Sequence, residues 1–170
     1  MTTATASAAP QAPSRSFLTR LVTAGLAGAL VDFVYADIVG AIGGRSIVQV
    51  WQGVAGAWLG KAARDGGLAS MSLGLATHIG IAMCMAAVYA LAATRLPILY
   101  RRPALMGALY GLPLYGVMYR IVLPLRWPEV FPRWDGWRSI ADLGSHIGVG
   151  LAIALVLSGR LLARKEAQPA

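Results

Sequence analysis

The chain has 170 residues, of which 57% are hydrophobic and 13% are charged, and its formal net charge is +8. Soluble domains usually have about 45–50% apolar and about 25% charged residues, so this composition predicts a membrane protein rather than a water-soluble one. The basic residues stand at the ends of apolar segments, as residues that flank membrane helices do, and nucleic acid is therefore not expected as a partner. The single Cys84 excludes an internal disulfide.

The N-terminal residues 1–16 are rich in Ala, Thr, Ser and Pro, and this composition predicts a disordered tail. The first apolar segment covers roughly 18–42, which is long enough for a helix to cross a bilayer with some tilt. Gly28 and Asp32 lie on one face of that helix, and a small residue there would let another helix approach closely.

A shorter helical pattern, 45–61, follows Gly43-Gly44. Its apolar stripe includes Trp51 and Trp58, while polar and small residues form the opposite face. This pattern predicts a helix lying in the membrane interface with the two Trp side chains as anchors. A short re-entrant segment is the alternative.

Three more apolar segments are long enough to span, at roughly 70–94, 103–123 and 139–162. Pro113 predicts a kink in the second of these. Ser139 is expected to cap the last one, with Asp142 in the capping-box position.

The expected fold is an all-α polytopic membrane protein with four transmembrane helices and one interfacial helix between the first and second. The transmembrane domain would cover 17–164, and 165–170 would form a C-terminal tail. Close helix packing is expected at four glycines, two of which form a GxxxG pair. They are Gly28, Gly107, Gly111 and Gly148.

Similar motifs surround the two histidines, with His-Ile-Gly at 78–80 and at 146–148. The preceding helices share a Gly-Ala-Leu triplet at 28–30 and 107–109. These matches predict an internal repeat of two helices plus two helices, which would place His78 and His146 at the same depth.

Four spans place both termini on one side of the membrane. Lys and Arg are densest in the short segments on that side, which predicts cytoplasmic termini. All five tryptophans then fall on the outer side as interface anchors. They are Trp51, Trp58, Trp127, Trp134 and Trp137.

The ionisable residues within the spans gather in the outer half of the membrane. They are Asp32, Asp37, His78, Arg120, Asp142 and His146. Each such group costs about 2.5–3.5 kcal/mol to insert, so these side chains should face inward and pair. Two interpretations stay open. One is an outward-facing polar cavity or proton relay. The other is a purely structural cluster in which Arg120 neutralises an aspartate and the histidines donate to the backbone or to Ser and Thr. Asp142 and His146, four apart, could contact each other and sense external acidity.

The second half of the chain resembles the YagU-like family of bacterial inner-membrane proteins. The resemblance covers roughly 75–162 and is carried by Thr77-His78-Ile79, Gly107-Ala108-Leu109, Trp137, Asp142 and His146. It implies a multi-span inner-membrane protein and transfers no catalytic residues.

The leading functional hypothesis is assembly, sensing or scaffolding in the membrane, through an outward-facing polar cluster. A small proton-coupled transporter is the first alternative, and a haem-binding subunit held by the two histidines is the second. No zinc-ligand spacing, phosphate loop, dinucleotide fingerprint or nucleophile elbow is present, so neither an enzyme nor a metal or cofactor site is expected. The expected partners are the lipid bilayer and either a second copy of the chain or another membrane protein.

Overall fold

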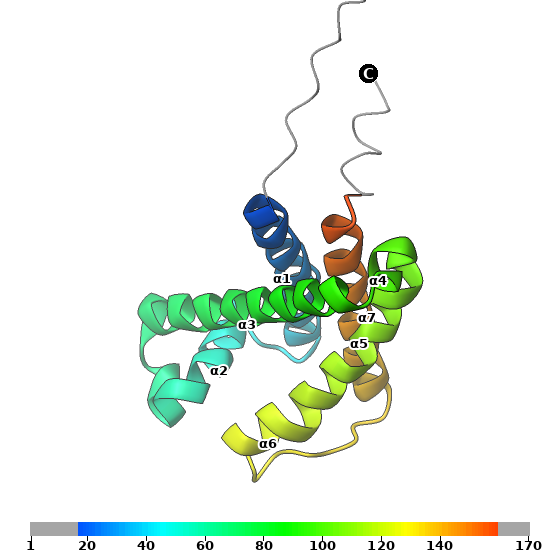
Figure 1. Ribbon diagram of the computed structural model, residues 1–170. Coiled ribbons are helices and arrows are strands. Elements are labelled where there is room, and N and C mark those ends of the chain that lie inside the picture. Colours follow the sequence, from blue (N-terminus) through cyan, green and yellow to red (C-terminus); the bar gives the residue numbers. More distant parts are fainter. Residues whose placement is uncertain (1–16, 160–170) are drawn as a thin grey trace, which may run out of the picture.

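The computed structural model describes residues 17–159, and every regular element in that range is helical (Figure 1). The predicted tails, 1–16 and 165–170, and the last residues of the predicted fourth span lie outside the described residues. Four helical stretches are long and apolar enough to cross a membrane, as predicted. They are α1 (Phe17–Ile42), α3 (Gly67–Arg95), the stretch Pro103–Arg126 and α7 (Trp137–Leu157).

Large apolar side chains cover the outer faces of these helices. Leu30 of α1 is 62% exposed, Leu91 of α3 is 68% exposed, and Ile121 in the third stretch is 53% exposed. Water would solvate such faces poorly, whereas lipid chains match them, and the helices satisfy their own backbone hydrogen bonds. The chain is therefore a multi-pass membrane protein.

The helix α7 lies at the centre and packs against both α1 and α5. The buried core includes Ile153 and Ala154 of α7, Ala24 of α1 and Tyr89 of α3. In Figure 1, α3 runs across α1 and α7 rather than alongside them. At 29 residues α3 is about 44 Å long, against a hydrocarbon thickness of about 30 Å, so it can tilt strongly and still cross.

The helices α5 (Pro103–Val117) and α7 approach each other through glycines, as the GxxxG pair predicts. A Cβ atom on Gly107 would lie 2.7 Å from the Gly150 carbonyl oxygen, and one on Gly111 would lie 2.6 Å from the Ile147 nitrogen. Gly150, which the prediction did not include, meets the backbone of Gly107 from the other side. No larger residue fits at this crossing without separating the helices.

Gly28 and Gly148 lie at the α1–α7 contact. A Cβ on Gly28 would sit 3.0 Å from the Ile153 side chain, and one on Gly148 would sit 3.1 Å from that of Val31. The predicted repeat pairs Gly28 with Gly107, but their contacts differ, because Gly107 meets α7 backbone and Gly28 meets α7 side chains.

The helix α2 (Ile47–Leu59) is shorter than predicted and is followed by the 3₁₀ turn η1 (Gly60–Arg64). Ser46 caps it in a reciprocal capping box with Gln49. The helix packs closely on α3, where a Cβ on Gly74 would collide with the backbone of Trp51. The Trp51 side chain is completely buried and stacks on Phe33 of α1, so the prediction of Trp51 as an interface anchor is wrong.

The third stretch is not uniform. After the four-residue helix α4 (Ile98–Arg101), α5 leads into η2, a π-helical turn (Met118–Val122), and then into α6 (Leu123–Arg126). Pro124 lacks an N–H and its ring would collide with the carbonyl four residues earlier in a regular helix. A wider turn before Pro124 relieves that collision, and such turns are frequent at functional sites.

The helix α7 begins at Trp137, two residues earlier than predicted, after Gly136 with a positive φ of 53°. Ser139 is therefore inside the first turn, where its hydroxyl accepts a hydrogen bond from the Asp135 N–H at 2.9 Å. Neither Ser139 nor Asp142 is the predicted cap, because the turn at Gly136 starts the helix before Ser139.

The glycine crossing yields a stability test on one helix. Gly111→Ala should lower the melting temperature of the purified protein, because the added methyl meets α7 backbone and overpacking typically costs about 1–3 kcal/mol. The matched control is Gly116→Ala, also in α5, where a Cβ meets nothing within 4 Å. That control should leave the melting temperature unchanged or raise it, since Ala favours helix over Gly. Equal melting temperatures for the two variants would contradict the close crossing.

Candidate functional site

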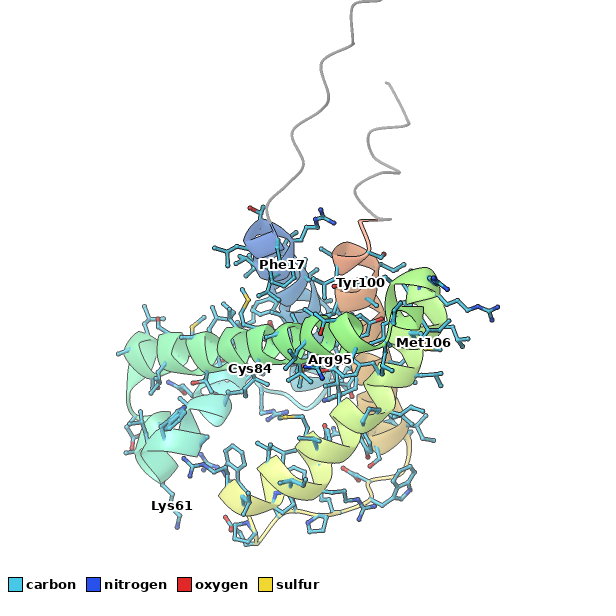
Figure 2. All side chains as sticks on the ribbon, in the orientation of Figure 1. Phe17, Lys61, Cys84, Arg95, Tyr100 and Met106 are labelled. Atoms are coloured by element: carbon cyan, nitrogen blue, oxygen red, sulfur yellow. The ribbon has the colours of Figure 1, made fainter. Side chains whose placement is uncertain are left out.

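The helices enclose a cavity of about 450 Å³. It lies on the side of the molecule that is away from the start of α1 and the end of α7. Its walls come from the second half of α1, from α2, from the middle of α3, from η2 and α6, and from the first half of α7. Figure 2 shows side chains of α2 and of the α5–α6 stretch extending into the space between these two segments. Most of the lining is apolar, and four of the six predicted ionisable residues lie on it: Asp32, His78, Asp142 and His146.

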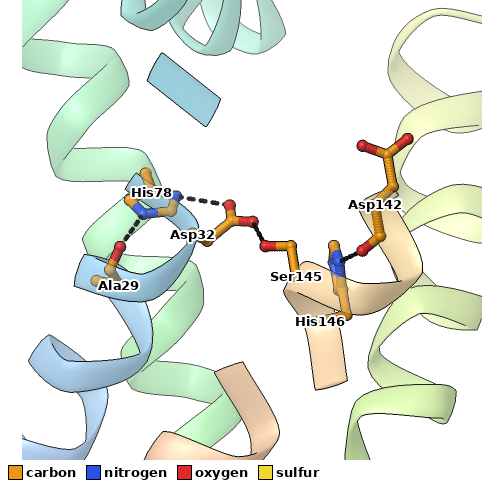
Figure 3. Close-up of polar contacts among 6 residues, drawn as sticks. All are labelled: Ala29, Asp32, His78, Asp142, Ser145 and His146. Atoms are coloured by element: carbon orange, nitrogen blue, oxygen red, sulfur yellow. Dashed lines mark hydrogen bonds and ion pairs between the residues drawn. The ribbon is translucent and has the colours of Figure 1, made fainter. Parts of the chain in front are cut away.

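The first polar group joins three helices (Figure 3). The Ser145 hydroxyl of α7 donates to Asp32 Oδ1 of α1 at 2.6 Å. The other carboxylate oxygen of Asp32 lies 3.8 Å from Nδ1 of His78 on α3. Nε2 of His78 lies 2.9 Å from the Ala29 carbonyl oxygen, and the ring packs on Trp51 with centroids 4.8 Å apart. The imidazole is thereby fixed in place on both sides.

The fixed position of the ring determines which nitrogen of His78 carries a hydrogen. A carbonyl oxygen can only accept, so Nε2 of His78 carries a hydrogen. Nδ1 then faces the Asp32 carboxylate at 3.8 Å, which is beyond hydrogen-bond distance.

The second polar group joins α1 and α7. The Tyr35 hydroxyl donates to Asp142 Oδ1 at 2.6 Å, and the Tyr119 hydroxyl of η2 also interacts with this carboxylate. His146 is buried, and its Nδ1 donates to the backbone carbonyl oxygen of Asp142 at 2.8 Å. In Figure 3 the Asp142 carboxylate points away from that ring. The expected contact between the Asp142 and His146 side chains is therefore replaced by a bond to the main chain.

The hydrogen bonds of the two polar groups follow one antiparallel register between α1 and α7. Asp32 and Tyr35 are three residues apart on α1, and Asp142 and Ser145 are three apart on α7. Each helix thus offers one carboxylate and one hydroxyl, and each carboxylate accepts from the hydroxyl of the other helix. The result is a reciprocal pair of hydrogen bonds one helical turn apart.

Aromatic rings from η2 and from the loop after α6 form a further part of the lining. Tyr119 stacks on Tyr115 with ring centroids 4.5 Å apart, and it meets Phe131 and His146 edge to face at 6.0 and 5.8 Å. Tyr119 belongs to the π-helical turn, and Met118, Tyr119 and Val122 of that turn all line the cavity. The local widening before Pro124 therefore shapes this part of the lining.

At the exposed rim of the cavity, α2 contacts α6 and the residue that follows α6. Arg126 donates to the Ala57 carbonyl oxygen and lies over the Trp58 ring, 5.4 Å from its centroid. Trp127 packs against Gly56, and the indole N–H of Trp58 donates to Thr77 on α3 at 2.9 Å. We call Arg126, Trp127, Gly56, Ala57 and Trp58 the rim contact.

Two predicted members of the cluster lie elsewhere. Arg120 is exposed and does not line the cavity, and no ion pair joins it to an aspartate among residues 17–159, so the expected neutralisation by Arg120 is wrong. Asp37 is not among the residues that line the cavity, and both of its buried carboxylate oxygens lack a hydrogen-bond partner within the described part of the chain. Trp51 Nε1 is unpartnered in the same way.

Sequence reasoning missed Tyr35, Ser145, Tyr119 and Arg126. The first two carried a usable signal, because a hydroxyl three residues from an acid on each of two apolar helices permits reciprocal pairing. Nothing in the sequence places Tyr119 or Arg126 at the cavity, because their positions depend on the π-helical turn and on the packing of α2.

The geometry does not favour metal or haem ligation. Within residues 17–159 no three His, Cys, Asp or Glu side chains are grouped so that they could hold a metal ion. Both ring nitrogens of His78 face protein oxygens, at Ala29 and Asp32, so neither is directed at an iron atom. The alternative of a haem held between two histidines therefore has no support from the arrangement.

No protein-family model, curated protein or solved structure matches the chain. The resemblance to the YagU-like family stays a prediction, and the geometry of the cavity is the basis for the function proposed below.

The reciprocal hydrogen bonds can be tested by removing one hydroxyl. Tyr35→Phe should lower the free energy of unfolding by about 1.5–3 kcal/mol, the usual range for a hydrogen bond to a charged group. The control is Tyr115→Phe, since the Tyr115 hydroxyl has no hydrogen bond in the described region and the change keeps its ring. Denaturation in mild detergent would measure both. A loss of equal size in the two variants would argue against the Tyr35–Asp142 bond.

Proposed function

We propose that this chain is a multi-pass protein of the bacterial inner membrane that senses a small molecule taken up from the outer side into its cavity. The single observation that carries the proposal is the collection of Asp32, His78, Asp142 and His146 on one largely apolar cavity. Cavities of about 300–1,000 Å³ with a few convergent polar groups are typical of ligand sites.

A role that is structural alone explains these residues less well. A cluster that only held the helices together would be expected to close on itself, as a fully paired polar network does in a membrane. Here the paired carboxylates border a cavity of about 450 Å³ that reaches exposed residues such as Arg126 and Val130. The rim contact offers the sensing element, because an occupant would press directly on Trp127.

Proton-coupled transport is the second candidate. The observation that favours it is the presence of a carboxylate and an imidazole, those of Asp32 and His78, side by side at the cavity wall, since chains of Asp and His side chains form proton relays in transporters. A transporter must also expose this cavity to the other side of the membrane in turn, which a sensor need not do.

The proposed orientation places both termini in the cytoplasm. It rests on the density of Lys and Arg beside the helix ends on the terminal side. A reporter fused after Ala170 should be active in the cytoplasm, and one inserted beside Asp135 should report the outside. The reverse pattern would overturn the orientation and with it the outward opening of the cavity.

Access to the cavity can be measured with a thiol probe. In a Cys84→Ala background, Val54→Cys places a thiol on the α2 wall of the cavity. A membrane-impermeant methanethiosulfonate should label it in intact cells. Leu91→Cys is the control, because Leu91 is an exposed apolar position outside the lining and should face lipid, where the thiol stays unreactive.

The labelling also separates the two candidates. Labelling of Val54→Cys from the outer side only favours sensing, whereas labelling in both intact cells and inverted vesicles favours transport. If only the permeant form of the reagent reacts, the cavity does not open outward and the proposed function fails.

A further inference from the structure

The charges around the cavity indicate what it takes up. The carboxylates of Asp32 and Asp142 lie on the same wall of the cavity. Asp32 accepts a hydrogen bond from Ser145, and Ser145 is three residues from Asp142 on α7. Their hydrogen-bond donors are the hydroxyls of Ser145 and Tyr35, which carry no charge. Among residues 17–159 no Lys or Arg forms an ion pair with either carboxylate, so negative charge is left on this wall apart from the contact with His78.

The aromatic rings beside this wall would also attract a positive charge. Tyr119 interacts with Asp142 and stands between Tyr115 and Phe131. Aromatic faces attract cations, and the combination of aromatic rings with carboxylates is the usual way in which proteins bind alkylammonium groups. The remaining lining, which includes Val39, Ile81 and Val149, is apolar and suits a hydrocarbon body.

Two arginines also line the cavity, and both belong to its exposed rim. The Arg126 guanidinium donates to the Ala57 carbonyl oxygen and lies over the Trp58 ring, so its charge is directed toward α2. Arg45 is exposed at the junction of α1 and α2. The cavity is thus polarised, with positive charge at the rim and negative charge at the α1–α7 wall.

We propose that the cavity binds an amphipathic organic monocation, with its ammonium group against Asp32, Asp142 and Tyr119 and its apolar body toward α2 and α3. This inference rests on the proposed uptake of a small molecule. It names the class of that molecule and excludes anions, which would meet two carboxylates at the α1–α7 wall.

The test compares three probes of similar shape and different charge on the purified full-length protein in nanodiscs. They are benzyltrimethylammonium, its neutral isostere neopentylbenzene and the anion benzenesulfonate, with binding followed by tryptophan fluorescence and by calorimetry. The cation should bind at least about tenfold more tightly than the neutral isostere, and the anion should not compete. Asp142→Asn and, separately, Asp32→Asn should each weaken cation binding by about tenfold and leave binding of the neutral isostere unchanged.

Asp65→Asn is the matched control, since it removes the same charge from an exposed residue outside the cavity. It should bind the cation as the wild type does. Retained binding of the neutral isostere by the Asp142 and Asp32 variants shows that they are folded. If one of these two variants does not fold, the other variant and the order in which the wild type binds the three probes decide whether the cation proposal holds.

The outcomes separate this inference from the function on which it rests. Equal or tighter binding of the neutral isostere or the anion overturns the cation proposal and leaves uptake of a small molecule standing. If none of the three probes binds, the cation proposal is also overturned, and the thiol labelling of Val54→Cys decides by itself whether the cavity takes up molecules from outside.

Discussion

The reciprocal hydrogen bonds between α1 and α7 are the interaction on which the rest of this structure depends. A carboxylate in a membrane-spanning helix needs a partner, and α1 and α7 supply one to each other in both directions. The same antiparallel register continues toward the core, where Gly28 meets Val149. Because neutral hydroxyls satisfy the carboxylates, the helices are joined without an arginine, and the negative charge remains available at the cavity wall.

Burial of these groups also explains why α3 is included in the site. His78 bonds to a backbone carbonyl of α1 and faces Asp32, so the strongly inclined α3 is attached to α1 by a side chain as well as by packing. Trp51 of α2 then packs on the His78 ring and on Phe33. The polar cluster therefore organises four elements around one hollow, whereas the α5–α7 crossing is made by glycine backbone.

The spans were predictable from the sequence, because length, apolar content and the positions of Gly and Pro decide where a membrane helix begins and ends. Gly107 and Gly111 were also predictable, since few roles other than close packing require a GxxxG pair in an apolar helix. The register between α1 and α7 was not predictable, and it decides which residue is the hydrogen-bond partner of Asp142. Trp51 was mistaken for an anchor because burial of an amphipathic helix depends on which surface covers it, here α3. Ser139 was mistaken for a cap because a glycine with positive φ starts the helix earlier.

The glycine crossing has a mechanical consequence for the cavity. Gly107, Gly111 and Gly150 put backbone against backbone, so α5 and α7 cannot slide or separate without losing many contacts together. On the other side of the cavity, α6 is held to α2 by a few side-chain contacts, chiefly those of Arg126 with Ala57 and Trp58. The cavity therefore has one stiff wall and one compliant wall. Because α2 is fixed on α3 at Gly74, any change in the volume of the cavity is taken up by α6, on the side where the hollow reaches the surface.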